Sequence, residues 1–239
     1  MASSVPSFFT FGGCSADCIS FLGSTLLVAG YYARFHFRSR KTPGYSNLAI
    51  IAQARRLWTR GVMTETGKDV MAVQTLRNFI MVGIMMASTA SLLIMGTLTL
   101  SGQEENIIRG WHSLGAFASH AQEVRTIKVL CLLIDLLVAF FSYALSLRLA
   151  TQVLFMINVP PALAAGHSEL SWERVADRLV QAGNLVALGM RAFMLAIPIV
   201  FWLFGPIFLF LATIGLVVTL DNLDRNKLPH RSHFPDTGP

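Results

Sequence analysis

The sequence predicts an all-α integral membrane protein: a bundle of four transmembrane helices with two amphipathic interfacial helices. Residues 193–220 form 28 consecutive positions without a charged side chain. A helix of that length is about 42 Å long, which is more than enough to cross a hydrocarbon core of roughly 30 Å. Of the 239 residues, 54% are apolar and only 13% are charged, and the charged residues cluster between apolar runs.

Four apolar runs are expected to form the spans. A backbone in lipid must satisfy its hydrogen bonds within the segment, so each run is predicted to be a helix. A transmembrane β-barrel would need segments of about ten residues in which apolar and polar side chains alternate, and these runs do not alternate. The predicted membrane domain covers residues 18–220, with spans at about 18–33, 79–100, 129–147 and 193–220.

The basic residues predict the orientation, because cytoplasmic loops of membrane proteins are enriched in Lys and Arg. Nine basic residues lie between the first two runs and four between the last two, whereas the middle loop and the C-terminal tail hold three each. We therefore expect the two richer loops in the cytoplasm. The N-terminal segment 1–17 and the polar tail 221–239 are both expected on the non-cytoplasmic side, and the membrane is expected to be the bacterial inner membrane.

The first cytoplasmic loop contains a predicted amphipathic helix, NLAIIAQARRLWTRG, at residues 47–61. On a helical wheel its apolar residues share one face with Trp58, and Arg55, Arg56 and Arg60 lie on the other. This pattern is typical of a helix that lies in the membrane interface and is anchored by an aromatic ring. Packing against the protein's own bundle is the alternative, and both arrangements can hold together.

A second amphipathic helix is predicted over residues 172–190, after the helix-breaking pair Pro160 and Pro161. Its charged residues balance in sign, so its attraction to anionic lipid should be weaker than that of the first helix. We expect it to lie along the cytoplasmic face and to lead into the last span.

Asp135 is the candidate for chemistry inside the membrane, because it lies near the middle of the third apolar run. A charge at the centre of a transmembrane helix costs roughly 2.5–3.5 kcal/mol on insertion scales, so the side chain should face the bundle interior. It can pair with Lys128, two turns earlier, or with a group on another helix. One interpretation is a relay for protons or cations, and the other is an interhelical hydrogen bond that fixes packing.

The second apolar run carries a stripe of small residues, Gly83, Ala87 and Ser91, at intervals of four. Small residues at this spacing let two helix backbones approach closely. The stripe is therefore expected to pack inside the bundle, to dock a partner subunit, or to line a polar route for a small solute.

The last run contains Pro198 and the pair Gly205 and Pro206, which predict a kinked or broken helix. Broken helices bind ions in transporters, where a second broken element usually occurs in a matching repeat. The sequence has no internal repeat, and this weakens the transporter interpretation.

No signature of an enzyme, a metal site or a cofactor site is found in the sequence, so none of these is expected. His112 and His120 lie eight residues apart in the middle loop and form at most a weak candidate for a metal or tetrapyrrole site. The net charge of +6 does not indicate nucleic acid, because the basic residues flank membrane segments, where they fit anionic headgroups.

Two stretches, MAVQTLRNFIMVGIMMASTASLL and RAFMLAIPIVFWLFGPIFLFLATIGLVV, together with FFSYALSLRLA, carry a family resemblance. The set resembles the membrane family called domain of unknown function 599, over about residues 28–220. The resemblance implies a helical protein with four spans and supplies no activity. It implies motif positions, without roles, at Arg77, Asn78, Arg191, Trp202 and Pro206.

Four residues are predicted to lie together at the cytoplasmic interface: Arg77, Asn78, Arg148 and Arg191. Three guanidinium groups at one depth can bind the headgroup of a phospholipid or a small acidic metabolite. The alternative is that the three arginines are separate anchors that reach toward the headgroups.

These observations predict a non-enzymatic multi-pass membrane protein that acts as an accessory or structural subunit of a larger membrane complex. The alternative is a transporter or channel for a small solute or ion, which uses Asp135 and the polar face of the second span. A lipid-anchored enzyme is a third interpretation, and no constellation of residues supports it. The expected partners are membrane lipids and either another membrane complex or further copies of this chain.

Overall fold

The computed structural model describes residues 12–41, 47–65, 67–101, 122–164 and 166–224. Every regular element in these ranges is helical. The helices are α1 (Gly12–Lys41), α2 (Asn47–Thr64), α3 (Asp69–Ser101), α5 (Gln122–Ile157), α6 (Pro161–Ala164), the 3₁₀ helix η2 (Ser168–Leu170), α7 (Trp172–Phe204) and α8 (Pro206–Asp224).

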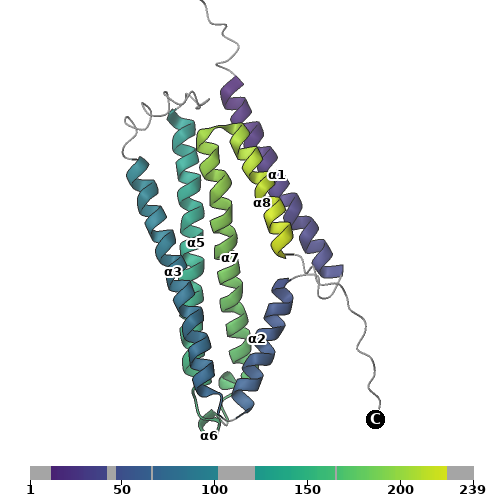
Figure 1. Cartoon of the computed structure of the whole chain (residues 1–239), viewed down its shortest axis with the longest axis vertical. Coiled ribbons are helices and arrows are strands. Elements are labelled where there is room, and N and C mark those ends of the chain that lie inside the picture. The colour runs from purple at the N-terminus through teal and green to yellow at the C-terminus, as the bar shows by residue number, and fades with distance from the viewer. Residues whose placement is uncertain (1–11, 42–46, 66, 102–121, 165, 225–239) are drawn as a thin grey trace, which may run out of the picture.

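Three long helices form the body of the molecule. α5 packs against α3 and α7, and these helices run alongside one another for most of their length (Figure 1). α8 folds back from the end of α7 and pairs with α1, while α2 packs against the half of α7 that lies farther from this pair. The α2–α3 turn and the segment with α6 lie together at one end, which we call the lower end as Figure 1 is drawn.

The three long helices are longer than a membrane requires. α3, α5 and α7 contain 33, 36 and 33 residues, which corresponds to about 50 Å each. Within the described residues these three are long and apolar enough to cross a membrane, and Pro206–Asn222 is a shorter apolar helix. The hydrocarbon core is roughly 30 Å thick. About 20 Å of each long helix is therefore left over for contacts outside the core.

Buried side chains form successive layers along α5. In the lower layer, Val153 of α5 lies in one cluster with residues of α2, α3 and α7, among them Val62, Leu76 and Val175. Tyr143 marks the middle layer, and the upper layer contains residues of α5 and α7 with Ile94 of α3. A separate cluster joins α1 to α8. The three long helices are thus joined along most of their length, whereas α1 and α8 pack mainly on each other and on α7.

The segment 172–190 differs from the prediction of a separate interfacial helix. It is the first half of α7, which continues without a break to Phe204. Its apolar face is instead packed inside the protein, where Val175 and Leu179 share a core cluster with Val153 of α5. Nothing between residues 190 and 193 breaks a helix, so the amphipathic segment and the apolar segment form one continuous rod.

The segment 193–220 also differs from the prediction, because it is not one span but parts of two helices. α7 passes through Pro198, which is buried, and ends at Phe204. Gly205 has φ of 152°, a conformation that side-chain-bearing residues rarely adopt, and α8 begins at Pro206. A proline at the first helical position costs no hydrogen bond, because that N–H has no partner within the helix. The predicted break is therefore a hairpin.

Candidate functional site

The predicted interfacial helix α2 is attached to α7 by its basic face. Arg56 Nη2 lies 2.8 Å from Asp177 Oδ1, and the guanidinium carbon of Arg60 lies 5.4 Å from the centre of the Trp172 ring. Trp58 is half-buried and packs against the lower core layer instead of standing free as an anchor. Of the two alternatives, packing on the bundle is the one that accounts for the basic face.

The apolar face of α2 points away from the bundle. Ile50, Ile51 and Leu57 are 40%, 47% and 61% exposed. The helix thus turns Thr59 and Val62 inward with the half-buried Arg55, and it turns Ile50, Ile51 and Leu57 outward.

Arg55 lies deeper in this interface than its two neighbours. A Cβ atom placed on Gly183 would lie 1.9 Å from Arg55 Nη1, so the guanidinium group rests directly on the backbone of α7. Burial lowers the pKa of Arg55 below its ordinary value. Thr59, which is fully buried, donates a hydrogen bond to the Arg55 carbonyl oxygen at 2.9 Å. The glycine therefore makes room for a charged group between two helices.

Asp135 lies half-buried on α5, and its Oδ2 atom is buried without a hydrogen-bond partner within the described residues. The suggested pair with Lys128 does not form. Lys128 is 2% exposed, and its ammonium nitrogen lies 5.2 Å from the centre of the Trp202 ring. On its other side, Trp202 stacks on Phe21 of α1, with ring centres 4.8 Å apart. A buried carboxylate oxygen without a partner costs free energy, and water, a proton or a cation can relieve that cost.

The predicted stripe of small residues is divided between two faces of α3. Gly83 faces α5, where an added Cβ would lie 2.7 Å from Leu147 Cδ2. Ala87 packs in the middle core layer with Tyr143, whereas Ser91 is exposed. Gly83 and Ala87 thus serve close packing within this chain, and Ser91 does not take part in it.

The predicted anion site is not assembled. Because Gly83 lies beside Leu147 and Ala192 lies in a cluster with Tyr143, the register places Arg77 and Arg191 about 14 Å apart along the bundle. Arg77, Asn78 and Arg148 are exposed. The guanidinium carbon of Arg191 lies 5.5 Å from the centre of the Tyr32 ring on α1. Arg191 is thus held against α1, whereas Arg77 and Arg148 lie on the outer surface of the described structure.

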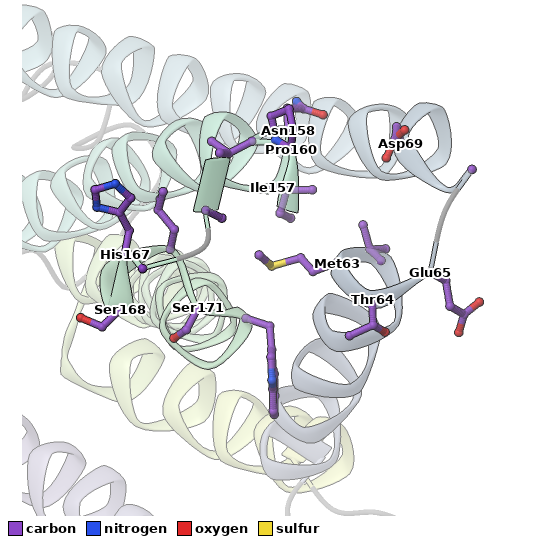
Figure 2. Close-up of a pocket in the computed structure, with 17 residues that line it drawn as sticks. Met63, Thr64, Glu65, Asp69, Ile157, Asn158, Pro160, His167, Ser168 and Ser171 are labelled. Atoms are coloured by element: carbon purple, nitrogen blue, oxygen red, sulfur yellow. The ribbon is translucent and has the colours of Figure 1, made fainter. Parts of the chain in front are cut away.

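A cavity of about 900 Å³ opens at the lower end, between the α2–α3 turn and the α5–α7 connection (Figure 2). Its walls combine apolar residues such as Met63, Ile157 and Trp172 with polar ones such as Asp69 and Asn158. Sequence reasoning missed this site, because its residues come from three segments that are up to 110 positions apart. Gly67 and Gly166, with φ of 85° and 95°, are the turn signals that the sequence offers for this region.

No group of three or more His, Cys, Asp or Glu side chains is placed to hold a metal in the described ranges. His112 and His120 lie outside those ranges.

The comparisons with known proteins agree with the sequence resemblance. Searches of curated proteins and of solved structures gave no significant match. One family model, described as "Protein of unknown function, DUF599", matches residues 19–228, which is most of the chain. The apolar helices of membrane-spanning length agree with this match. We conclude that this chain belongs to the family of unknown function DUF599.

Proposed function

We propose that the protein is a non-enzymatic accessory subunit that docks against another membrane protein through the outer face of α3. The observation that carries this proposal is the one-sided packing of α3, which contacts mainly α5. Its opposite face is exposed along the apolar segment and carries Ser88, Ser91 and Gly96. Small and hydroxyl side chains are what membrane helices present to one another, because they allow close backbone approach.

This face is suited to a partner and is not needed for the fold of the chain itself. A Cβ atom on Gly96 would have nothing within 4 Å, so no part of the described structure requires a glycine there. Glycine lowers helix stability by about 1 kcal/mol relative to alanine. We therefore infer that Gly96 allows the backbone of a partner helix to approach α3 closely.

The topology that we propose has five crossings instead of the four predicted from sequence, because α7 and α8 form a hairpin. With α1, α3, α5, α7 and α8 crossing in turn, the N-terminus is non-cytoplasmic and the C-terminus is cytoplasmic. Sixteen of the nineteen Lys and Arg residues then lie on the cytoplasmic side. This distribution supports the arrangement, because cytoplasmic segments are enriched in basic residues. The bacterial inner membrane and contact with its lipids remain part of the proposal.

Purification from the native membrane in mild detergent tests the docking proposal. The full chain should co-purify with another membrane protein at a constant ratio, and Gly96→Leu should abolish this recovery without loss of folding. Gly215→Leu is the matched control, because Gly215 is an exposed glycine on α8 that also has nothing within 4 Å. A wild-type protein recovered alone contradicts the proposal, and so does one recovered only with copies of itself.

Asp135 supports a second candidate, the transfer of protons or small cations. Its Oδ2 atom is buried within the described residues and lacks a hydrogen-bond partner. Proteoliposomes loaded with a pH-sensitive dye should show proton movement that Asp135→Asn abolishes. Proton movement that is equal in the variant, or absent from the wild-type protein over a range of ion gradients, rejects this candidate.

A further inference from the structure

The cavity at the lower end is built by the ends of four helices. Val62, Met63 and Thr64 come from the end of α2, and Ile157 comes from the end of α5. Asp69 begins α3 and Trp172 begins α7. Figure 2 shows Met63 extending from α2 toward the middle of the space, with Asp69 and Asn158 along one edge. The site is therefore part of the helical body.

The position of the cavity makes it accessible from water in the proposed topology. α1 and α8 do not reach the lower end (Figure 1). The three long helices exceed the hydrocarbon core by about 20 Å, and that excess lies on the side of α2. A ligand of this cavity is thus a water-soluble molecule or the soluble end of one.

The floor of the cavity is apolar. Val62 and Ile157 are 5% and 9% exposed and belong to the lower core layer, on which Met63 also packs. A ligand that fills a cavity of this size therefore needs an apolar body.

The polar groups of the cavity are mainly hydrogen-bond acceptors. Asn158 already donates a hydrogen bond through Nδ2 to the carbonyl oxygen of Leu154 at 2.8 Å, which leaves its Oδ1 as an acceptor. Ser171 precedes α7 but makes no side-chain capping bond. Asp69 supplies a carboxylate in the first turn of α3. Such a set fits a ligand that donates several hydrogen bonds.

The charges of the cavity favour a cation. Glu65 and Asp69 are the two carboxylates among the described lining residues, which include neither Lys nor Arg. Glu65 is paired with Lys68, whereas Asp69 takes part in none of the ion pairs found in the described ranges. The partial negative charges of the two helix C-termini around the cavity offset the partial positive charges of the two helix N-termini. The charged side chains therefore decide the sign of the electrostatic potential in the cavity.

We propose that this cavity binds a small amphipathic cation, in which an ammonium group is joined to an apolar body. The ammonium group donates hydrogen bonds to Asp69 and to the Asn158 amide oxygen, and the apolar body lies against Met63 and Ile157. This binding is independent of the docking face on α3.

Three probes that share a phenyl group and differ in their polar end test the proposal: the cation 2-phenylethylamine, the neutral 2-phenylethanol and the anion phenylacetate. Calorimetric titration of the full chain in zwitterionic nanodiscs, with empty nanodiscs as blank, should give saturable binding of one amine per chain. The amine should bind about tenfold more tightly than the alcohol or the acid, as expected for one partly solvated charge pair. Asp69→Asn should remove most of this preference while leaving the weak binding of the alcohol unchanged.

Glu173→Gln is the matched control, because Glu173 is exposed on the first turn of α7 and does not line the cavity. Its effect on amine binding should stay below about twofold, because Glu173 is outside the cavity and its charge is screened by the solvent between it and the ligand. If Asp69→Asn does not fold, Met63→Trp, which fills the cavity, should abolish amine binding instead. The proposal is overturned by equal binding of the three probes, by tighter binding of phenylacetate, or by no saturable amine binding.

Discussion

The guanidinium group of Arg55 in α2 occupies the space that a side chain at residue 183 of α7 would need. An added Cβ atom at Gly183 would lie 1.9 Å from Arg55 Nη1 and 2.2 Å from Arg55 Cζ. The two residues are more than 120 positions apart in the chain. The lack of a side chain at Gly183 thus allows the Arg55 guanidinium group to pack between α2 and α7.

Gly183→Ala is expected to destabilise the fold by about 1–3 kcal/mol, because the new methyl group overfills a packed interface and displaces a charged group. The measurement is the unfolding midpoint in detergent. Gly215→Ala is the control, since nothing lies within 4 Å of a Cβ atom there, and it should stabilise its helix slightly.

The same variant also allows a test by a double-mutant cycle. Arg55→Ala removes the group that the methyl would strike, so the combined variant should lose much less stability than the sum of the two single changes. If the stability losses of the two single variants were additive, the destabilisation by Gly183→Ala would not arise from its contact with Arg55.

Tyr143→Phe should be neutral or stabilising. Tyr143 is fully buried, and its hydroxyl oxygen has no hydrogen-bond partner among the described residues. Deleting a buried polar group that lacks a partner removes a desolvation penalty and leaves the ring in place. Tyr143→Ala, by contrast, should cost about 3–5 kcal/mol, because it leaves a cavity beside Gly189. A Tyr143→Phe variant that unfolds much more easily than the wild type would reveal a partner for the hydroxyl.

Asp135→Leu separates the two interpretations of Asp135. If the carboxylate serves transfer of a proton or cation, its burial destabilises the fold. Asp135→Leu should then raise the unfolding midpoint while abolishing transport. If instead the carboxylate joins two helices by a hydrogen bond, the same change should lower the midpoint. Thermal unfolding measured alongside proton flux distinguishes these outcomes.

The proposed topology predicts opposite locations for the two termini. Tags at the N-terminus should be accessible to a membrane-impermeant reagent in intact cells, and tags at the C-terminus should react only after lysis. A tag within residues 102–121 serves as a second external reference. Two termini that react alike would restore the four-span arrangement.

Several features of the fold could be predicted from the sequence because they depend on local chemistry. The runs 79–100 and 129–147 lie within α3 and α5, since long apolar runs in lipid must be helical. The break near Gly205 and Pro206 was likewise predicted from two residues with special backbone preferences. What these residues could not reveal is the direction in which the chain continues after the break.

The orientation of α2 could not be predicted, because the partners of its arginines lie far away in the chain. Asp177, Trp172 and Gly183 are on α7, and nothing within residues 47–61 indicates them. One signal was present. Glycine in the middle of a helix costs about 1 kcal/mol relative to alanine, so Gly183 and Gly189 within a helical pattern suggest close contacts. The structure places Arg55 and Tyr143 at these two positions.

The φ angle of Gly205 determines on which side of the membrane the C-terminal end of the chain lies in the proposed topology. Its φ of 152° turns the polypeptide back on itself between α7 and α8. In the proposed arrangement, this reversal returns the basic tail to the compartment that also holds α2. A substitution at this residue would therefore change the side of the membrane on which the C-terminal tail lies.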